Sequence, residues 1–338
     1  MKIAIHKRPA SFSARWILYC QENNVPFKIV NCYDSDIIEQ LKDCDGLMWH
    51  WAHYDHKAQL FARQLTYSLE IVGKKVFPDS KTCWHYDDKL GQKYLLEVIG
   101  APFVPTYVFY DKSQALKWAE NARYPMVFKL RGGAGSENVK IVRDIPKAKK
   151  LIKQAFGKGF KARDRKNFLK ERLWHFKRDK DFTTLFKISK GIGRLFIPTE
   201  AEKTLHSEKN YVYFQEFIPE NDHDIRIIVI GNRAFAIKRM VRERDFRASG
   251  SGVIVYDPSQ IPRICIEWSF KISSKLQSQC LAYDFVFQNN KPFLVEISYA
   301  FARTGYLPCP GYWDETLAWH EGMFYPEWFM IEDFLQDI

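Results

Sequence analysis

The chain has 338 residues, of which 46% are hydrophobic and 16% aromatic, so it is long enough for two or three domains with sizeable cores. No apolar run approaches the ~20 residues of a membrane span, and Met1–His6 is typical of a short strand and not of a signal peptide. Seven scattered cysteines without a C-x-x-C pair argue against a disulfide framework or a zinc site, and they predict a reducing, cytoplasmic location.

The net charge of +11 comes from one segment of the chain. Residues 147–194 contain 17 Lys or Arg and 4 Asp or Glu, a local net charge of +13, which leaves −2 for the rest. We interpret this basic insert, about residues 147–208, either as a surface for an anionic partner or as a solvated helical face near an anionic nucleotide. Leu169, Leu173 and Phe176 are spaced i, i+4, i+7 and predict an amphipathic helix within it. No DNA- or RNA-binding signature accompanies the charge, so nucleic acid is not an expected partner.

The first 85 residues alternate strands and helices, which predicts an N-terminal αβ domain with a mostly parallel sheet. Strands are expected over residues 3–7, 27–30, 46–51 and 75–77, with helices between them. No G-x-G-x-x-G follows the first strand, so a dinucleotide site is not expected. Loops at the carboxyl ends of parallel strands bind ligands, and two of these loops are polar, His6–Pro9 and His50–His56. The histidines of the second loop leave three interpretations open: a metal site, a loop for a polar substrate, or a plain surface loop.

A Gly-rich turn lies at the centre of the next region. A helix is expected over residues 79–100, a strand over 105–110 and a helix from Ser113. An apolar strand then runs into Lys129, the turn Arg131–Ser136 follows, and a second strand returns over residues 138–142. Glycines at three of four positions allow backbone N–H groups to approach an anion without steric hindrance. The stretch is therefore either a phosphate-binding hairpin or an ordinary hairpin whose glycines serve only the turn.

The remaining residues predict two hairpins and a closing helix. A strand is expected over residues 211–219, a hairpin over 224–239, a polar loop over 242–252, a helix near 271–279 and a second hairpin over 283–297. The aromatic tail from Leu307 is expected to close the core with a helix. Asp284 and Glu296 lie within the apolar strands of the second hairpin, where a carboxylate is costly unless it is paired or bound to metal. They predict either a Mg²⁺ site or structural ion pairs with nearby arginines.

Taken in order, these motifs resemble those of the ATP-grasp superfamily, and most of all its branch of glutathione synthetase and ribosomal-protein glutamate ligase. The motifs are Asp88-Lys89, Lys129 before the Gly-rich turn, Gln215–Ile218, Asp224–Arg226, Lys238-Arg239, Asp245–Arg247, Asp284 and Glu296–Ser298. The resemblance covers about residues 85–305. It implies an α/β (α+β) ATP-grasp fold in which two α/β subdomains clasp ATP. These would be a central subdomain of residues 86–210 and a core subdomain of residues 211–338, preceded by the N-terminal αβ domain of residues 1–85.

The resemblance also implies a role for each motif. Phosphate contacts would come from Lys89 and Lys129, and a mobile lid over the phosphates from Gly132, Gly133, Gly135 and Ser136. Glu216, Phe217 and Ile218 would run beside adenine, with Asp224 near the ribose, while Arg239 and Arg247 would face the γ-phosphate and the acyl phosphate. Asp284, Glu296 and Ser298 would hold Mg²⁺, with two ions implied and Mn²⁺ as a substitute. Ser298 stands where the family usually has Asn, and this departure puts the geometry of the second metal in question.

The activity that the resemblance implies is ligation. A carboxylate would attack the γ-phosphorus of ATP, and an amine, or less often a thiol, would then displace phosphate from the acyl phosphate. The expected substrates are small-molecule or peptide carboxylates and amines. Two alternatives stay open: a kinase of the same fold that phosphorylates a hydroxyl, and a catalytically weak ATP-binding module whose basic insert binds an anionic partner. The oligomeric state is open as well, with a homodimer as one option.

Overall fold

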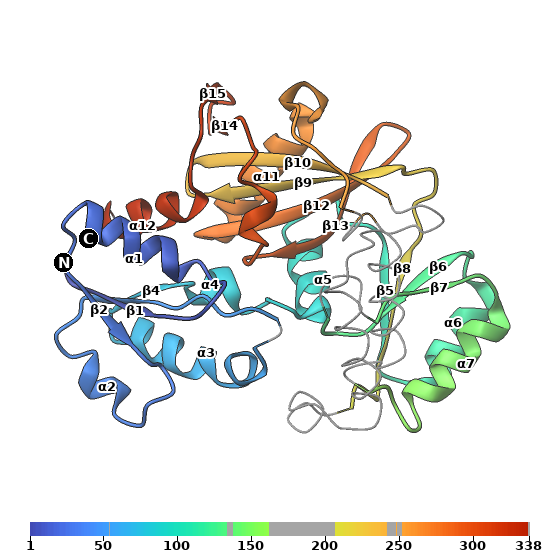
Figure 1. Cartoon of the computed structure of the whole chain (residues 1–338). Helices are drawn as coiled ribbons and strands as arrows, with labels where there is room; N and C mark the ends of the chain where they lie inside the picture. Colours follow the sequence, from blue (N-terminus) through green and yellow to red (C-terminus); the bar gives the residue numbers. More distant parts are fainter. Residues whose placement is uncertain (54, 134–137, 162–206, 242–247, 249–251, 337–338) are drawn as a thin grey trace, which may run out of the picture. The chain divides into compact units, whose positions relative to one another are not determined.

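A computed structural model describes residues 1–53, 55–133, 138–161, 207–241, 248 and 252–336 of the chain (Figure 1). The chain forms two compact units. The first unit contains Met1–Tyr86, Gly91–Phe103 and Ile218–Ile338, and the second contains Asp87–Leu90 and Val104–Phe217. The three-domain division predicted from the sequence stays a prediction, and each unit is described here by itself.

The N-terminal part of the first unit is the parallel sheet that the sequence predicts. Its strand order is β2-β1-β3-β4, and every neighbouring pair is parallel. The strands are β1 (Ile3–His6), β2 (Phe27–Val30), β3 (Gly46–Met48) and β4 (Lys75–Phe77), and the helices are α1 (Ser13–Glu22), α2 (Ile37–Gln40), α3 (His56–Ile71) and α4 (Ser80–Cys83). Alternate residues of β1 enter different cores, because Ile3 and Ile5 pack with α1 whereas Ala4 packs with α3. Helices therefore cover both faces of this sheet.

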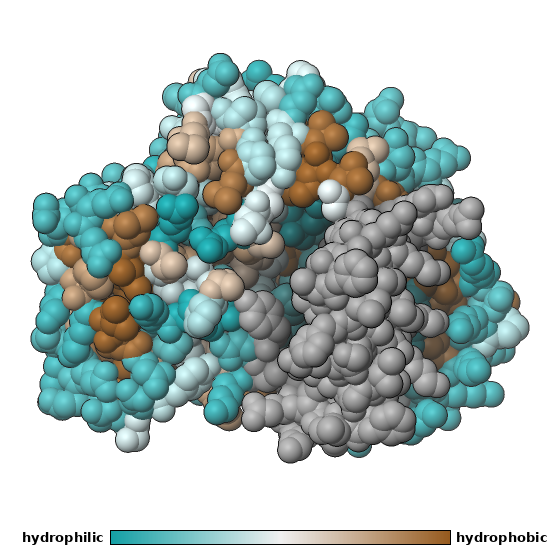
Figure 2. All heavy atoms as spheres, in the orientation of Figure 1, coloured by the Kyte–Doolittle hydropathy of each residue, from teal (hydrophilic) through white to brown (hydrophobic). Residues whose placement is uncertain are grey.

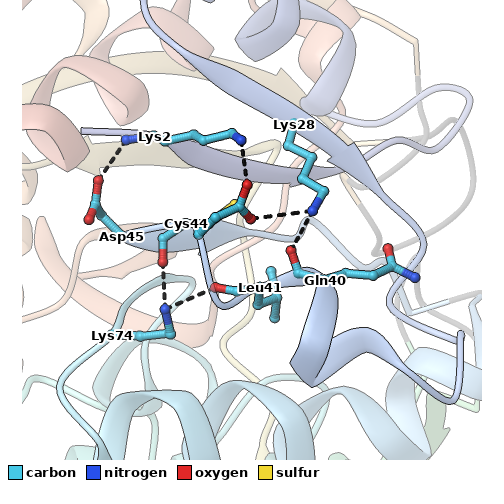
Figure 3. A network of polar contacts seen from close by, with 8 residues as sticks. Lys2, Lys28, Gln40, Leu41, Cys44, Asp45 and Lys74 are labelled. Carbon is cyan, nitrogen blue, oxygen red and sulfur yellow. Dashed lines mark hydrogen bonds and ion pairs between the residues drawn. The ribbon is translucent and has the colours of Figure 1, made fainter.

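Three lysines form hydrogen bonds to the segment between α2 and β3 (Figure 3). Lys2 and Lys28 both donate to the carboxylate of Asp43, at 2.5 and 3.3 Å. Lys74 donates to the carbonyl oxygens of Leu41 and Cys44, at 2.9 and 2.5 Å. The carbonyl of Leu41 also accepts from Cys44 N at 3.1 Å, so Lys74 adds a second partner there.

The second sheet of the first unit is antiparallel and has the order β13-β12-β9-β10-β14-β15, with β11 added beside β10. Its strands are β9 (His223–Ile230), β10 (Arg233–Met240), β11 (Ile254–Val255), β12 (Cys280–Gln288), β13 (Lys291–Ser298), β14 (Gly311–Asp314) and β15 (Trp319–Glu321). The helical segments of this part are α5 (Lys89–Val98), α11 (Arg263–Leu276), α12 (Pro326–Gln336) and the short turns Pro258–Gln260 and Arg303–Gly305. One face of the sheet packs with α11 through residues such as Ile225 and Ile227, and the other packs with α1 and α12 through Ile228 and Ile230.

The second unit is a four-stranded antiparallel sheet with two helices. The order is β5-β8-β6-β7, formed by β5 (Thr106–Phe109), β6 (Met126–Lys129), β7 (Lys140–Val142) and β8 (Val212–Glu216). The helices α6 (Lys112–Asn121) and α7 (Ile145–Ala155) pack with the sheet through Ala119, Ile152 and Phe214. Phe160 and Glu208 exchange backbone hydrogen bonds of 2.8 and 2.9 Å. The two ends of the segment of residues 162–206 are therefore paired with each other. The amphipathic helix predicted around Leu169 lies outside the described residues.

Several predicted elements differ from the structure, among them the helix predicted near residues 271–279, which is α11 and begins eight residues earlier, at Arg263. The helix expected over residues 79–100 is divided into α4 and α5, because Asp87 adopts a positive φ of 53° that a continuing helix does not allow. The tail does end in a helix, α12, but the hairpin of β14 and β15 first extends the second sheet. Cross-strand contact of Trp313 with Trp319 stabilises this hairpin, at 4.6 Å between ring centroids.

Hydrophilic residues cover most of the face shown in Figure 2, and hydrophobic residues appear there in separate small groups. Scattered exposed apolar side chains of this kind are normal for a folded protein. None of the helices in the described part of the chain combines the length and the apolar character that a transmembrane span requires.

Candidate functional site

Lys129 is held at the end of β6, where the Gly-rich turn begins. It is only 5% exposed, and its ammonium donates to Oε1 of Gln215 at 2.6 Å. The amide of Gln215 in turn donates to Thr106 Oγ1 at 3.1 Å. Because these residues lie on β6, β8 and β5, the hydrogen bonds cross the sheet and fix where the cation lies. The hairpin that the sequence predicts around Lys129 is confirmed by the antiparallel pairing of β6 with β7.

Lys89 contacts the same turn in the second unit. Its ammonium donates to the carbonyl oxygen of Gly133 at 2.8 Å, and its backbone N–H donates to Arg131 O at 3.0 Å. The N–H of Gly133 donates to Asp87 Oδ1 at 2.8 Å. Gly133 has φ 116°, a conformation that favours glycine. Lys89 and the first half of the turn therefore form one hydrogen-bonded group, whereas Gly135 and Ser136 lie outside the described residues.

The predicted adenine strand is β8 and the residues after it. Glu216 ends β8, and its carboxylate accepts a hydrogen bond of 2.9 Å from the hydroxyl of Tyr107. Its N–H donates to Pro105 O at 2.9 Å. Phe217 closes the second unit, and Ile218 is the first residue of the C-terminal segment of the first unit.

A cluster of charges occupies one end of one face of the second sheet, in the first unit. The register places Arg239 opposite Asp224, Arg226 opposite Asp284, and Asp284 opposite Glu296. Side chains of residues that are directly opposite point to the same face of a sheet. Further along β9 on this face come Ile228 and Ile230, which pack into the apolar core with α1 and α12. The face is therefore apolar at one end and charged at the other.

Two arginines and two aspartates of this charged end form bidentate pairs. Arg226 donates from Nε and Nη2 to the two oxygens of Asp284, at 2.5 and 2.6 Å. Arg239 donates in the same way to Asp224, at 2.7 and 2.5 Å, and its Nη2 also lies 3.1 Å from Asp284 Oδ2. Bidentate hydrogen bonds between a guanidinium group and a carboxylate fix the orientation of both side chains as well as the distance between them. The four groups are thus one rigid network in which each acid is paired with an arginine.

The environment keeps these groups in defined ionisation states. Burial pushes the pKa of Asp284 upward, but Arg226 and Arg239 outweigh burial and hold that pKa well below its ordinary range. Burial is the largest influence on Asp224 too, and there it raises the pKa against the opposing charge of Arg239. Burial also raises the pKa of the adjacent Tyr306 to about 12, so its hydroxyl stays protonated beside Arg226. At neutral pH the network presents two guanidinium groups and at least the ionised carboxylate of Asp284.

Comparison with known proteins agrees with this arrangement of motifs. Residues 188–305 match the family described as the RimK-like ATP-grasp domain. The alpha-aminoadipate–LysW ligase LysX of Saccharolobus solfataricus is 22% identical over 232 residues, which are 68% of this chain and 67% of the relative. Residues 188–305 are thus similar to an ATP-grasp domain, as the sequence motifs predict. The match is to the RimK-like branch, which is the branch that these motifs resemble.

Solved structures of ATP-grasp proteins have the same fold. The RimK domain protein of Sphaerobacter thermophilus superposes with a TM-score of 0.54 at 15% identity and covers 90% of this chain and 94% of its own. The D-alanine–D-alanine ligase of Bacillus anthracis, solved with ATP, gives 0.54 at 14% identity and covers 92% and 89%. The predicted fold class is thereby confirmed. Since the relatives include ATP-grasp ligases, the comparisons support ATP-dependent ligation and do not favour a catalytically weak binding module.

The resemblance of the sequence motifs implies a divalent cation, and the oxygens at the charged end are of the kind that binds Mg²⁺. Mg²⁺ is usually bound by one or two carboxylates together with substrate phosphates. Glu296 lies opposite Asp284, and Ser298 follows two residues later on the same face of β13. Each oxygen of Asp284 accepts bonds from arginine, yet a carboxylate has about four lone-pair sites and retains acceptor capacity.

Ser298 fits the site as a neutral ligand. Its hydroxyl donates to Ala300 O at 2.8 Å, which leaves oxygen lone pairs for a cation. Within the described ranges, no group of three or more His, Cys, Asp or Glu side chains is arranged to hold a metal. Among the described residues, a cation at this place would therefore depend on the two carboxylates and Ser298, together with oxygens of the bound substrate.

One residue of the network received no role from the sequence. Arg226 was part of the motif Asp224–Arg226, but only the pairing of β9 with β12 shows that it holds Asp284. The two-residue spacing of Asp224 and Arg226 was the available signal, because it puts both on one face of a strand. Arg247 lies outside the described residues.

The first histidine of each polar loop of the N-terminal sheet lies in a buried aromatic region. His6 accepts a hydrogen bond of 3.0 Å from the backbone N–H of Cys32, and its ring packs against Trp49. His50 is 4% exposed, so a plain surface loop is wrong for this residue. The metal interpretation finds no support among the histidines that the structure describes. A loop for a polar substrate stays a prediction.

Proposed function

We propose that the chain is an ATP- and Mg²⁺-dependent ligase that joins a carboxylate to an amine through an acyl phosphate. The observation that carries this proposal is the charged end of the second sheet. There, two acids at family metal positions, Asp284 and Glu296, lie beside Arg226 and Arg239 on one face. The substrates in this proposal are small molecules or peptides, and a thiol is the alternative nucleophile.

The reaction requires that the protein position the reactants and neutralise the negative charge of the phosphates. The substrate carboxylate attacks the γ-phosphorus, the bond to the β-phosphate oxygen breaks, and ADP leaves. The amine then attacks the acyl carbon, loses a proton, and releases inorganic phosphate. Fixed cations stabilise the charge that develops on the transferred group, and they need no reorganisation during the reaction.

The predicted site residues have the following roles in this reaction. Lys89 and Lys129 bind phosphate oxygens, helped by backbone N–H groups of the Gly-rich turn, which includes Gly132, Gly133, Gly135 and Ser136. Glu216, Phe217 and Ile218 border adenine, and Asp224 lies near the ribose and orients Arg239 through its bidentate pair. Arg239 and Arg247 face the transferred phosphoryl group, and Arg226 positions Asp284.

Asp284, Glu296 and Ser298 would hold Mg²⁺, as two ions or with Mn²⁺ in its place. The chemistry that the bound cation supplies is neutralisation of the phosphate charge. All seven cysteines are buried free thiols, which supports the proposal of a reducing, cytoplasmic compartment.

The direct test is ADP release by the purified protein, with amino acids, short peptides and amino sugars screened as substrates. One or more compounds should stimulate ADP release in the presence of Mg²⁺. Glu296→Gln should lower the stimulated rate roughly 100-fold or more, because a metal-binding charge is lost while the shape is kept. Glu321→Gln, on exposed β15, is the matched control and should retain the rate. Equal rates for the two variants would show that the metal assignment is wrong.

A further inference from the structure

His50 has one satisfied nitrogen and one buried nitrogen without a partner. Its Nδ1 accepts a hydrogen bond of 3.1 Å from the backbone N–H of Phe12. Its Nε2 is inaccessible to solvent and has no hydrogen-bond partner in the part of the chain that the structure describes. A buried polar atom without a partner costs about 1–3 kcal/mol, so its retention calls for an explanation.

The contact with Phe12 determines the tautomer of His50. Because Nδ1 acts as an acceptor, the neutral imidazole carries its proton on Nε2. Burial lowers the pKa of His50 well below its usual range, and the nearby charge of Arg8 lowers it further, so the ring is neutral at pH 7. The unpartnered group is therefore an N–H donor and not an acceptor.

The ring of His50 is held rigidly in this orientation. It stacks on Phe12 with 3.7 Å between centroids and an interplanar angle of 9°. Tyr299 contacts it edge-on at 6.1 Å. A donor on a fixed ring loses little entropy when it binds an acceptor, which is the property of a preorganised binding group.

The surroundings of His50 also favour an acceptor with negative charge. The indole N–H of Trp16, whose ring contacts Phe12, likewise has no partner among the described residues, and it is a donor. The charge of Arg8 acts on His50 and on Tyr299.

The same place is also the start of α1. Phe12 is the N-cap residue of this ten-residue helix and offers no capping side chain, and the first turn contains no acidic residue. The N–H groups of Phe12 and Ser13 already donate to His50 Nδ1 and Ser11 Oγ, but no acidic residue in the first turn neutralises the positive end of the helix dipole. It adds to the field of Arg8 in favouring an anion.

We propose that His50, together with Arg8 and the start of α1, forms a binding site for a carboxylate of one of the ligase substrates, a carboxylate that does not react. Nε2–H of His50 donates to a carboxylate oxygen, and Arg8 supplies the counter-charge. The inference rests on the proposed ligase function for the identity of the ligand class, but the site itself can be tested without ATP.

The first experiment measures binding of succinate to the full-length protein by calorimetry, and ¹⁵N-histidine NMR reports the Nε2 resonance of His50. Succinate should shift this resonance and saturate. The uncharged isostere succinamide, and sulfate at the same ionic strength, should do neither. An equal response to all three would overturn the proposal.

Two substitutions separate a binding role from a structural one. His50→Asn retains an acceptor for the N–H of Phe12 but does not reach the position of Nε2, so succinate affinity should fall about tenfold or more while the thermal unfolding midpoint changes little. His50→Gln places a donor near Nε2 but removes the acceptor for Phe12, so the midpoint should fall while affinity stays within about threefold. If His50→Asn bound succinate as the wild type does, Nε2 would be the partner of a buried water and the site would be refuted.

A third variant distinguishes this proposal from the proposed function. Lys129→Met should weaken ATP binding and leave succinate binding unchanged. Failure of every compound in the ADP assay, combined with intact succinate binding that depends on His50, would refute the ligase proposal alone. Stimulated ADP release without succinate binding would refute the carboxylate site alone.

Discussion

The pairing of Arg226 with Asp284 should be one of the strongest single electrostatic contributions to the stability of the first unit. The two side chains are 21% and 14% exposed and share two short charge-assisted hydrogen bonds. Removing one partner of a buried pair costs about 3–5 kcal/mol, because the other charge is left without compensation. Here Arg239 remains 3.1 Å from Asp284, which places the expected cost at the lower end, about 3 kcal/mol for Arg226→Met.

A double-mutant cycle measured by urea unfolding tests this value. Arg226→Met and Asp284→Asn should each cost about 3 kcal/mol, and the double variant should cost about 2 kcal/mol less than their sum, because it leaves no unpaired charge at this pair. The exposed helical pair of Arg263 and Glu267 is the control, and its coupling should not exceed about 0.5 kcal/mol. Additive effects at Arg226 and Asp284 would refute the reasoning.

The pH dependence of the free energy of unfolding in the same double-mutant cycle tests whether Asp284 is stabilising in its ionised form. The charges of Arg226 and Arg239 hold the folded-state pKa of Asp284 below its ordinary value of 3.8. Its contribution to stability is therefore present above that value and is lost as the pH falls through the folded pKa. Arg226→Met should make the loss of stability below pH 4 less steep.

Two further predictions concern buried groups of the first unit. Tyr299→Phe removes a hydroxyl that accepts from Trp51 N at 3.0 Å and donates to Trp51 O, so urea unfolding should show a loss of about 2–4 kcal/mol. Tyr312→Phe, on the C-terminal hairpin, is its control, and an equal loss there would contradict the assignment. Burial, aided by Arg63, lowers the pKa of His85 from 6.5 to about 4, so stability should fall by on the order of 3 kcal/mol as the pH drops from 6.5 to 4. His85→Leu should flatten this dependence, and parallel curves for variant and wild type would contradict it.

Local patterns in the sequence were sufficient to predict most helices and strands. They also predicted the hairpin that carries Asp284 and Glu296 at the charged end of the sheet. Apolar residues flank Asp284 and Glu296 with the period of a strand, and the turn between them is short, so a hairpin could be predicted without knowing any distant contact. The structure confirms that these two residues are direct cross-strand neighbours. The parallel N-terminal sheet was predictable for a similar reason, since alternating strands and helices allow few other topologies.

Distant pairing could not be predicted in this way. Arg226 reaches Asp284 across 58 positions of sequence, and the choice between Mg²⁺ ligand and ion-pair partner depends on that contact. The structure shows that Asp284 is in an ion pair, and because it keeps acceptor capacity, both interpretations apply to the same carboxylate. The burial of His50 could not be predicted from the sequence either, because Phe12 and Tyr299, which contact its ring, come from opposite ends of the chain.

Strand β13 links the two proposed sites of the first unit. It carries Glu296 and Ser298 at the charged end of the sheet, and Tyr299 follows directly. The hydroxyl of Tyr299 is bonded to both backbone groups of Trp51, which is the residue after His50. Only a few covalent and hydrogen bonds thus separate the proposed metal ligands from the proposed carboxylate donor, and all the side chains on this path are buried or half-buried. Because a close-packed interior transmits displacement instead of absorbing it, a substrate carboxylate held at His50 would be held at a fixed position relative to Glu296.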